Sequence, residues 1–407
     1  MKKLLCLMIS AVVLLSVGCN VRKSESYNSF RIGKVTAFAD TVPLSENRKT
    51  GFYGFTAKLF SASVGDNMLF APLPIYTALG MTVNGAANKT LEEMLAAMEN
   101  TVDDINAVNL AAYKEVTENA DKTKVSLANS VWIKDDYGEY VKESYLDKLS
   151  AYYSPEVFSL PFNDKALKMI NDWAYNNTNG KIDKVIEKFG QDAVMELITA
   201  LYIKGKWREE AGSLSERTFK NADGSEGKAE YFSGSSALYA SERAYAVKRF
   251  MEGGYYMLAV LPNEKEDFGK YLSAFDGNEL YYLMNKTDPR GARYTFPEFE
   301  SENTLPLIPV LKNMGIMEAF SRYTADFSDM TDDPVGLYIA DAEQKAKIKV
   351  NRYGLEGSAT VKIEMGRKGS AAPPEDEPLR LEFNRPFIYF VCTPNDIPLL
   401  SGTVTKL

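Results

Sequence analysis

Histidine is absent from all 407 residues of the chain. A Ser-His-Asp triad, a Cys-His pair and any zinc site with a histidine ligand are therefore excluded. Carboxylate pairs of the glycosidase kind are not excluded, because 55 acidic residues always offer pairs, although none stands out in the sequence. The sequence also lacks a Walker loop, a dinucleotide fingerprint, a CxxC pair and a calcium loop. We therefore expect a protein that is not an enzyme and that needs neither a cofactor nor a metal.

Cysteine is scarce, with three residues in the chain. Cys6 and Cys19 lie in or just after the N-terminal apolar stretch, so Cys392 alone is left in the rest of the chain. A domain with one cysteine forms no internal disulfide, and its stability must come from packing. Within the apolar run FIYFVC, Cys392 is expected to behave as a buried apolar side chain.

A basic excess and a long apolar run are lacking as well. The formal net charge is −8, which gives no support for a nucleic-acid partner. The apolar run at residues 4–17 is short for a membrane span. Because Lys2 and Lys3 precede it, the pattern predicts an export signal at residues 1–18.

The junction of Gly18 and Cys19 resembles the lipobox of bacterial lipoproteins. The resemblance implies that Cys19 is lipidated and that residues 19–45 form a tether. We expect an exported lipoprotein of the outer membrane or cell surface of a Gram-negative bacterium, which contacts the membrane only through its lipid anchor. A periplasmic or secreted protein is the alternative. Residues 46–407 would then form a single domain.

Helical patterns dominate the first half of the chain. Phe52, Phe55, Leu59 and Phe60 keep helical spacing, TLEEM at 90–94 has the form of a capping box, and 165–177 is an amphipathic run. Strand-like stretches lie at 125–133 and 195–207.

Strand patterns dominate the second half. The stretches at 244–250 and 255–262 flank Glu252-Gly253-Gly254 and predict a hairpin, and further strands are expected at 293–299, 345–350 and 385–392. One helical run, at 304–315, interrupts them. Helices mostly first and strands mostly later predict an α+β fold built on large, mainly antiparallel sheets.

Residues 354–377, GLEGSATVKIEMGRKGSAAPPEDE, combine a strand pattern with the composition of an exposed loop. The alternation puts one set of residues on one face of a strand and a second set on the other: Leu355, Gly357, Ala359, Val361, Ile363 and Met365, then Glu356, Ser358, Thr360, Lys362 and Glu364. A dibasic pair, Arg367-Lys368, follows. An ordinary solvated surface loop is the simplest interpretation of such a pair taken alone.

Several blocks of sequence together resemble the serpin family from about residue 50 to the C-terminus. They are FAPLPIYTALGMTVNGAANKTLEEM (70–94), INDWAYNNTNGKI (170–182), ALYIKGKW (200–207), PEFESENTLPLIPVLKNMGIMEAFSRYTADFSDMT (297–331) and FNRPFIYFVC (383–392). The resemblance implies a serpin fold with large mixed and antiparallel sheets, about eight to nine helices and an exposed reactive-centre loop at about 354–378.

The resemblance also implies serine protease inhibition. In inhibitory serpins the protease cuts the loop, and the segment before the cut inserts as an extra strand in the main sheet. Such a segment must be soluble first and compatible with a strand later, which accounts for alternation inside a loop. Gly354 then becomes the hinge, and Gly357, Ser358, Ala359 and Thr360 are small enough to slip between strands. We expect a monomer that inhibits by suicide-substrate trapping.

The family's scissile residue usually lies fourteen positions after the hinge glycine, which is Lys368, followed by Gly369. Arg367 is the alternative if the loop is one residue shorter, and Met365 would suit a chymotrypsin-like protease. A basic residue fits the buried carboxylate of a trypsin-like specificity pocket. The expected partner is therefore a trypsin-like serine protease, held as a covalent acyl complex.

Some positions depart from the family pattern where the sheet opens. Thr199 and Gln344 replace a hydrogen-bonded Asn-His pair, and we interpret them as a different buried polar pair, with two unrelated polar residues as the alternative. Arg352 stands where a glutamate is usual, so an ion pair common at the top of the sheet is expected to be missing. Leu355 is larger than the residue usual there, and the resemblance places Trp207 near the point of loop insertion.

Two alternatives to inhibition are kept. The first is a serpin fold used for binding without inhibition, which an Ala359→Arg change in the hinge would leave intact. The second, more remote, is a carboxylate-based surface hydrolase, whose turnover would disappear on replacing a single acid.

Overall fold

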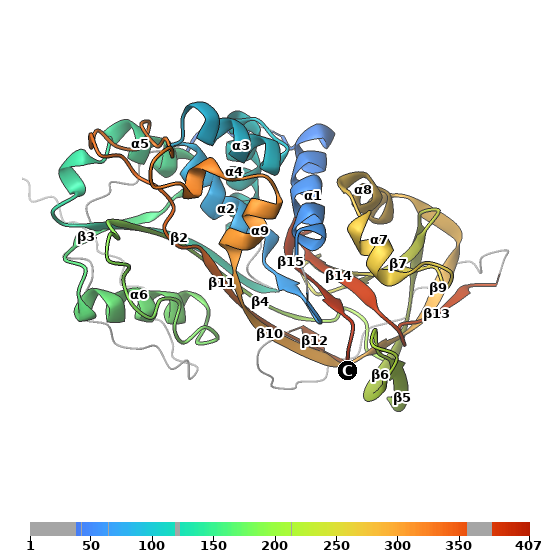
Figure 1. The fold of residues 1–407 in the computed structure, drawn as a ribbon. Coiled ribbons are helices and arrows are strands. Elements are labelled where there is room, and N and C mark those ends of the chain that lie inside the picture. The colour runs from blue at the N-terminus through green and yellow to red at the C-terminus, as the bar shows by residue number, and fades with distance from the viewer. Residues whose placement is uncertain (1–37, 42, 64, 119–122, 213, 356–376) are drawn as a thin grey trace, which may run out of the picture.

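Nine α-helices and two β-sheets form the described part of the chain in this computed structural model (Figure 1). The structure describes residues 38–41, 43–63, 65–118, 123–212, 214–355 and 377–407. The α-helices are α1 (Glu46–Ser61), α2 (Pro72–Val83), α3 (Asn88–Met98), α4 (Val102–Glu118), α5 (Glu143–Tyr153), α6 (Asp164–Asn177), α7 (Phe268–Ser273), α8 (Gly277–Asn285) and α9 (Leu307–Asn313). Two short 3-10 helices are η2 (Gly138–Tyr140) and η3 (Glu318–Phe320).

The smaller sheet has six strands and contains both parallel and antiparallel pairs. In spatial order its strands are β10 (Phe299–Pro306), β11 (Glu343–Asn351), β12 (Gly354–Leu355), β4 (Met195–Lys206), β2 (Lys124–Lys134) and β3 (Glu156–Leu160). β2 pairs in parallel with β3, and the other neighbours pair antiparallel. Because β12 is antiparallel to both β11 and β4, these two longer strands run in the same direction.

The larger sheet has nine strands and is also mixed. In spatial order its strands are β1 (Leu69–Phe70), β15 (Pro398–Val404), β14 (Phe387–Cys392), β8 (Tyr256–Pro262), β7 (Ala244–Phe250), β6 (Glu226–Ala240), β9 (Thr287–Pro297) and β13 (Leu379–Glu382), with β5 (Ser215–Lys220) paired to β6. Gly253 and Gly254 have φ of 85° and 90° in the β7–β8 hairpin, a region that favours glycine. β14 and β15 are buried along their whole length, including Cys392.

Helices cover both faces of the six-stranded sheet (Figure 1). α2 lies between the sheets and is buried at every residue except Ala78, as expected for a helix that is hydrophobic all round. α6 covers the opposite face, where Trp173 packs with Trp132 and Phe158 of the sheet. The rings of Trp132 and Phe158 stack with centroids 4.2 Å apart. The six-stranded sheet therefore has a buried face toward α2 and an outer face toward α6.

The α+β class, the mixed sheets and the number of helices agree with the sequence prediction. Two local predictions are wrong. Thr90 does not cap α3, which starts after Ala87; its hydroxyl accepts a 2.9 Å hydrogen bond from Asp326 N instead. The helix expected at 304–315 is α9 alone, because residues 304–306 pair with β11 as the end of β10.

Candidate functional site at the opening of the six-stranded sheet

Two residues of β12 hold the ends of β4 and β11 apart. Leu355 pairs with Gly205 of β4 on one side and with Val350 of β11 on the other. Its side chain is 1% exposed and belongs to the main core, on the face of the sheet that packs toward α2. The hinge predicted from the sequence therefore starts as a strand that is already seated between its two neighbours.

Below β12, no backbone pairing joins β4 to β11 among the described residues. The facing edges of these two strands therefore lack a neighbouring strand in the described part of the sheet. Free strand edges readily pair with another strand. This opening between β4 and β11, called the cleft below, is the candidate functional site.

Gly354 fits the start of the cleft because it has no side chain. A Cβ at this position would overlap the carbonyl oxygen of Gly205 on β4. Backbone atoms of a paired strand cannot move aside as a flexible side chain can. The close approach of the two strands therefore requires glycine at Gly354.

Trp207 ties the end of β4 to the end of β11. Its indole Nε1 donates a 2.7 Å hydrogen bond to the carbonyl oxygen of Asn351, and its backbone N donates to Tyr353 O at 3.3 Å. The ring is 6% exposed, and the guanidinium carbon of Arg249 lies 5.1 Å from its centroid. This geometry places Trp207 beside the hinge, as the resemblance implied.

Arg352 forms an ion pair at the same end of the sheet. Its Nε lies 3.8 Å from Oε1 of Glu298, and that oxygen also accepts a 3.0 Å hydrogen bond from Arg352 N. The sequence led us to expect a missing ion pair here, and Glu298 supplies one of a different kind. Just beyond it, Asn351 Oδ1 accepts hydrogen bonds from Tyr353 N at 2.9 Å and Gly354 N at 3.2 Å, which fixes the turn into β12.

Thr199 and Gln344 lie at the same level on the two sides of the cleft. Each is six residues back from a partner of Leu355, and neither strand has a shift in its regular pairing. They do not form the polar pair that the sequence suggested. Gln344 instead donates to Leu69 O at 3.0 Å and accepts from Ala71 N at 2.6 Å, whereas the buried Oγ1 of Thr199 has no hydrogen-bond partner among the described residues.

The outer side of the cleft carries a lysine cluster at its upper end, defined here as Lys124, Lys181, Lys204 and Lys206. Lys124 pairs directly across from Lys204, and Lys206 is two residues along on the same face of β4. Burial, followed by the charges of Lys181, Lys124 and Lys206, lowers the pKa of Lys204.

The lower end of the cleft has the opposite charge. Glu196 of β4 faces the same side of the sheet as Lys204. It lies nine residues before Gly205, and Asp341 lies nine residues before Val350, so the two acids are at the same level on opposite sides of the cleft. Burial, with a smaller contribution from Asp341, raises the pKa of Glu196 to about 7. The sequence pattern did not reveal Glu196, Glu298 or the lysine cluster, because only the strand register brings these residues to the cleft.

The remaining predicted site residues lie outside the described residues. They are Glu356, Gly357, Ser358, Ala359, Thr360, Val361, Ile363 and Met365 of the inserting segment, Arg367, Lys368 and Gly369 around the scissile bond, and Cys19. Their roles stay predictions.

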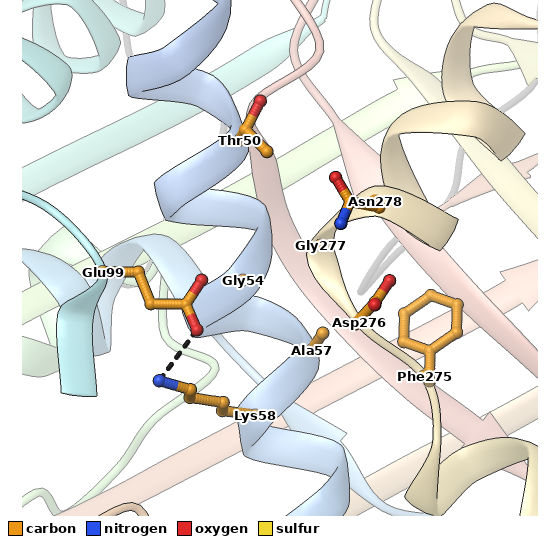
Figure 2. A pocket seen from close by; sticks show the side chains of 9 residues that line it. All are labelled: Thr50, Gly54, Ala57, Lys58, Glu99, Phe275, Asp276, Gly277 and Asn278. Atoms are coloured by element: carbon orange, nitrogen blue, oxygen red, sulfur yellow. Dashed lines mark ion pairs between the residues drawn. The ribbon is translucent and has the colours of Figure 1, made fainter. Parts of the chain in front are cut away.

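A separate surface pocket of about 250 Å³ lies between α1 and α8 (Figure 2). It is lined by Thr50, Gly54, Ala57, Lys58, Glu99, Phe275, Asp276, Gly277 and Asn278. Lys58 Nζ and Glu99 Oε1 form an ion pair of 2.8 Å at its side. Because none of the lining residues belongs to β4, β11 or β12, the pocket is distinct from the cleft.

Within the described ranges, no helix is long and apolar enough to span a membrane. The same residues contain no group of three or more Cys, Asp or Glu side chains placed to hold a metal ion.

Comparison with known proteins identifies the architecture. The family profile described as Serpin (serine protease inhibitor) matches residues 50–407. Human antithrombin-III is 26% identical over 86% of this chain and 77% of its own length, and an uncharacterized serpin-like protein of Thermococcus kodakarensis is 26% identical over 83% of this chain and 80% of its own.

Solved structures agree with this match. The thermophilic serpin tengpin in its native state superposes with a TM-score of 0.80 at 26% identity, covering 94% of this chain and 99% of tengpin. Its latent state gives a TM-score of 0.75 at 27% identity, over 90% of this chain and 100% of tengpin. The chain belongs to the serpin family, whose members are generally protease inhibitors rather than enzymes.

Proposed function

We propose that this protein inhibits trypsin-like serine proteases by suicide-substrate trapping. The observation that carries the proposal is the seating of Gly354 and Leu355 between β4 and β11, with both strand edges unpaired below them among the described residues. The 21 residues that separate Leu355 from Glu377 in the sequence are long enough to reach a protease and to supply a further strand.

The protease provides the chemistry. Its catalytic serine attacks the carbonyl carbon of Lys368, an acyl bond forms, and the bond to Gly369 breaks with release of that residue's amine. The segment from Glu356 onward then inserts into the cleft, and the attached protease is displaced before water hydrolyses the acyl bond. Insertion is favoured because it pairs two free strand edges and buries the apolar side chains of the segment.

An SDS-stable complex with trypsin is the test. We expect intact protein to form a covalent complex and to release a C-terminal peptide whose mass identifies Lys368 or Arg367 as the attacked residue. An Ala359→Arg variant should be cut without complex formation, because a charge on the inward face blocks insertion. If wild-type protein is only cleaved, across trypsin-like and elastase-like proteases, inhibition is refuted and a binding role is left.

We also propose that the protein acts outside the cytoplasm as a monomer anchored through Cys19. The support is the sequence alone: an apolar run after two lysines, ending at a small residue before cysteine. Metabolic labelling with a palmitate analogue should mark wild-type protein and spare a Cys19→Ala variant. Label retained by that variant would contradict the anchor.

A further inference from the structure

Arg249 of β7 is a buried cation that lies against the ring of Trp207. The residue is 6% exposed, and its guanidinium carbon lies 5.1 Å from the ring centroid of Trp207 and 5.0 Å from that of Phe232 on β6. Attraction between a cation and an aromatic ring is strongest away from water. The backbone of Trp207 also bridges to Met251, two residues after Arg249. Trp207 and Arg249 therefore form one packed unit where the smaller sheet meets the larger one.

Two hydrogen bonds fix the direction of the guanidinium group. Nη1 of Arg249 donates to the hydroxyl oxygen of Tyr294 at 2.8 Å, and Nη2 donates to the backbone carbonyl oxygen of Glu209 at 3.1 Å. Tyr294 belongs to β9 of the larger sheet, whereas Glu209 lies two residues after Trp207. Because the guanidinium is planar and its donors keep a fixed geometry, it holds this segment at a set angle to the larger sheet.

Gly234 of β6 leaves the space that this arrangement needs. Gly234 pairs across from Tyr294, and a Cβ on it would lie 2.8 Å from Nη1 of Arg249 and 2.5 Å from the hydroxyl oxygen of Tyr294. In a close-packed interior, contacts as short as these force the neighbours to move. Three strands of the larger sheet, β6, β7 and β9, thus set the position of one side chain.

Stability alone does not account for Arg249. Its two hydrogen bonds go to uncharged oxygens, and its buried Nε has no hydrogen-bond acceptor among the described residues. A buried donor without an acceptor costs free energy, and more so on a charged group. A native structure that keeps such a donor calls for a functional explanation. The segment next to Arg249 is the one that holds the hinge, since Trp207 Nε1 bonds the carbonyl oxygen of Asn351.

We propose that Arg249 is a positioning residue for loop insertion: it fixes the orientation of Trp207, and Trp207 keeps Gly354 and Leu355 seated between β4 and β11. A hinge that is already paired extends by adding residues, whereas a hinge that has left the sheet must first enter it again. This inference deepens the proposed function, on which it rests, and gives the larger sheet a part in the opening of the smaller one.

Arg249→Met in the full-length intact protein tests the proposal. We expect the amide of Leu355 to exchange its hydrogen about fivefold to tenfold faster, as for the loss of about one hydrogen bond. The number of inhibitor molecules consumed per protease trapped should rise about twofold to fivefold, because slower insertion competes less well with hydrolysis of the acyl bond. Lys248→Met is the matched control. It removes the neighbouring buried cation, which pairs with Asp396 at 3.3 Å and points to the opposite face of β7, and it should leave both measurements at wild-type values.

Two further variants distinguish positioning from a general loss of stability. In a Trp207→Phe background, Arg249→Met should add little to the exchange rate of the Leu355 amide, because the contact through which it acts is already lost. Gly234→Ala keeps the charge and displaces the guanidinium, so it should reproduce the effect of Arg249→Met, and it decides the matter if that variant does not fold.

The outcomes separate this proposal from the proposed function. Wild-type exchange of the Leu355 amide in both Arg249→Met and Gly234→Ala would overturn it, as would additive effects of Arg249→Met and Trp207→Phe. Faster exchange in these variants, in a protein whose wild type forms no SDS-stable complex with a protease, would refute inhibition and support the positioning of the hinge. A wild-type complex whose stoichiometry and hinge exchange are untouched by Arg249→Met would refute this proposal alone.

Discussion

The indole Nε1 of Trp207 donates a 2.7 Å hydrogen bond to the backbone carbonyl oxygen of Asn351, so one side chain joins two strands that do not pair directly below it. The two residues are 144 positions apart in sequence. The bond closes the upper end of the cleft around β12. Its strength therefore contributes to how easily β4 and β11 separate.

Replacing Trp207 by phenylalanine should weaken this closure. The change keeps an aromatic ring but removes the donor, and we expect a loss of about 1 to 2 kcal/mol in the free energy of unfolding of the intact protein, measured with urea. Trp173→Phe is the control, because its indole bonds Glu156 at 2.9 Å on the α6 side of the sheet. Both variants should lose stability, but only Trp207→Phe should change the number of inhibitor molecules consumed per protease trapped. Equal effects on that number would argue against a role for Trp207 in opening.

Alanine at Gly354 should displace β12. The added methyl group would overlap the carbonyl oxygen of Gly205, which belongs to a paired strand. Alanine at Gly205 would instead meet the flexible side chain of Met251. We expect Gly354→Ala to lower the free energy of unfolding by about 1 to 3 kcal/mol and to expose the amide of Leu355 to hydrogen exchange. The Gly205→Ala variant should show a smaller effect on both. A protected Leu355 amide in Gly354→Ala would contradict this placement of β12.

The two polar residues at the middle of the cleft should respond to mutation in opposite ways. Gln344→Leu removes the side-chain amide that bonds the carbonyl oxygen of Leu69 and the backbone N–H of Ala71. Both backbone groups would lose this hydrogen bond, and we expect the free energy of unfolding to fall by about 2 to 4 kcal/mol. Thr199→Val replaces a hydroxyl that has no hydrogen-bond partner in the described part of the chain by a methyl group of similar size. Its stability should be unchanged or higher by about 1 kcal/mol. Thermal denaturation of both variants beside wild type distinguishes them, and a destabilised Thr199→Val would mean that the hydroxyl is bonded.

Glu196 gives the fold a pH dependence near neutrality in a chain without histidine. Burial, and then Asp341, raise the pKa of Glu196 to about 7, above its value in an unfolded chain. The native state therefore binds more protons than the unfolded state between about pH 4.5 and 7, and this group's contribution to stability is lost as pH rises through 7. We expect Glu196→Gln to raise unfolding free energy by about 1 to 3 kcal/mol at pH 8 and to change little at pH 5. An equal gain at both pH values would show that ionisation is not the cause.

Elements with strong local patterns were predictable from the sequence. α6 and the β7–β8 hairpin follow from amphipathic spacing and from paired glycines, which act within a few residues. Thr90 was misjudged because its hydroxyl serves Asp326, 236 residues away. The end of β10 was taken for helix because pairing with β11 overrides local propensity there.

Local patterns likewise predicted only part of the candidate site. Alternation identified Leu355 as an inward residue, and the structure buries it. The Arg352–Glu298 ion pair and the lysine cluster depend on which strands are neighbours and in which register, and one sequence does not contain that information. Gln344 was recognised as a buried polar residue, but its partners, Leu69 and Ala71, come from the far end of the chain.

The shared direction of β4 and β11 has a mechanical consequence. If the segment after Leu355 inserts as proposed and pairs antiparallel with both strands, it would advance from the Gly354 end. Eleven residues from Leu355 to Met365 span about 36 Å as an extended strand. A protease attached beyond Met365 would then be carried along the length of β4 and β11, over a distance set by the number of residues that have paired.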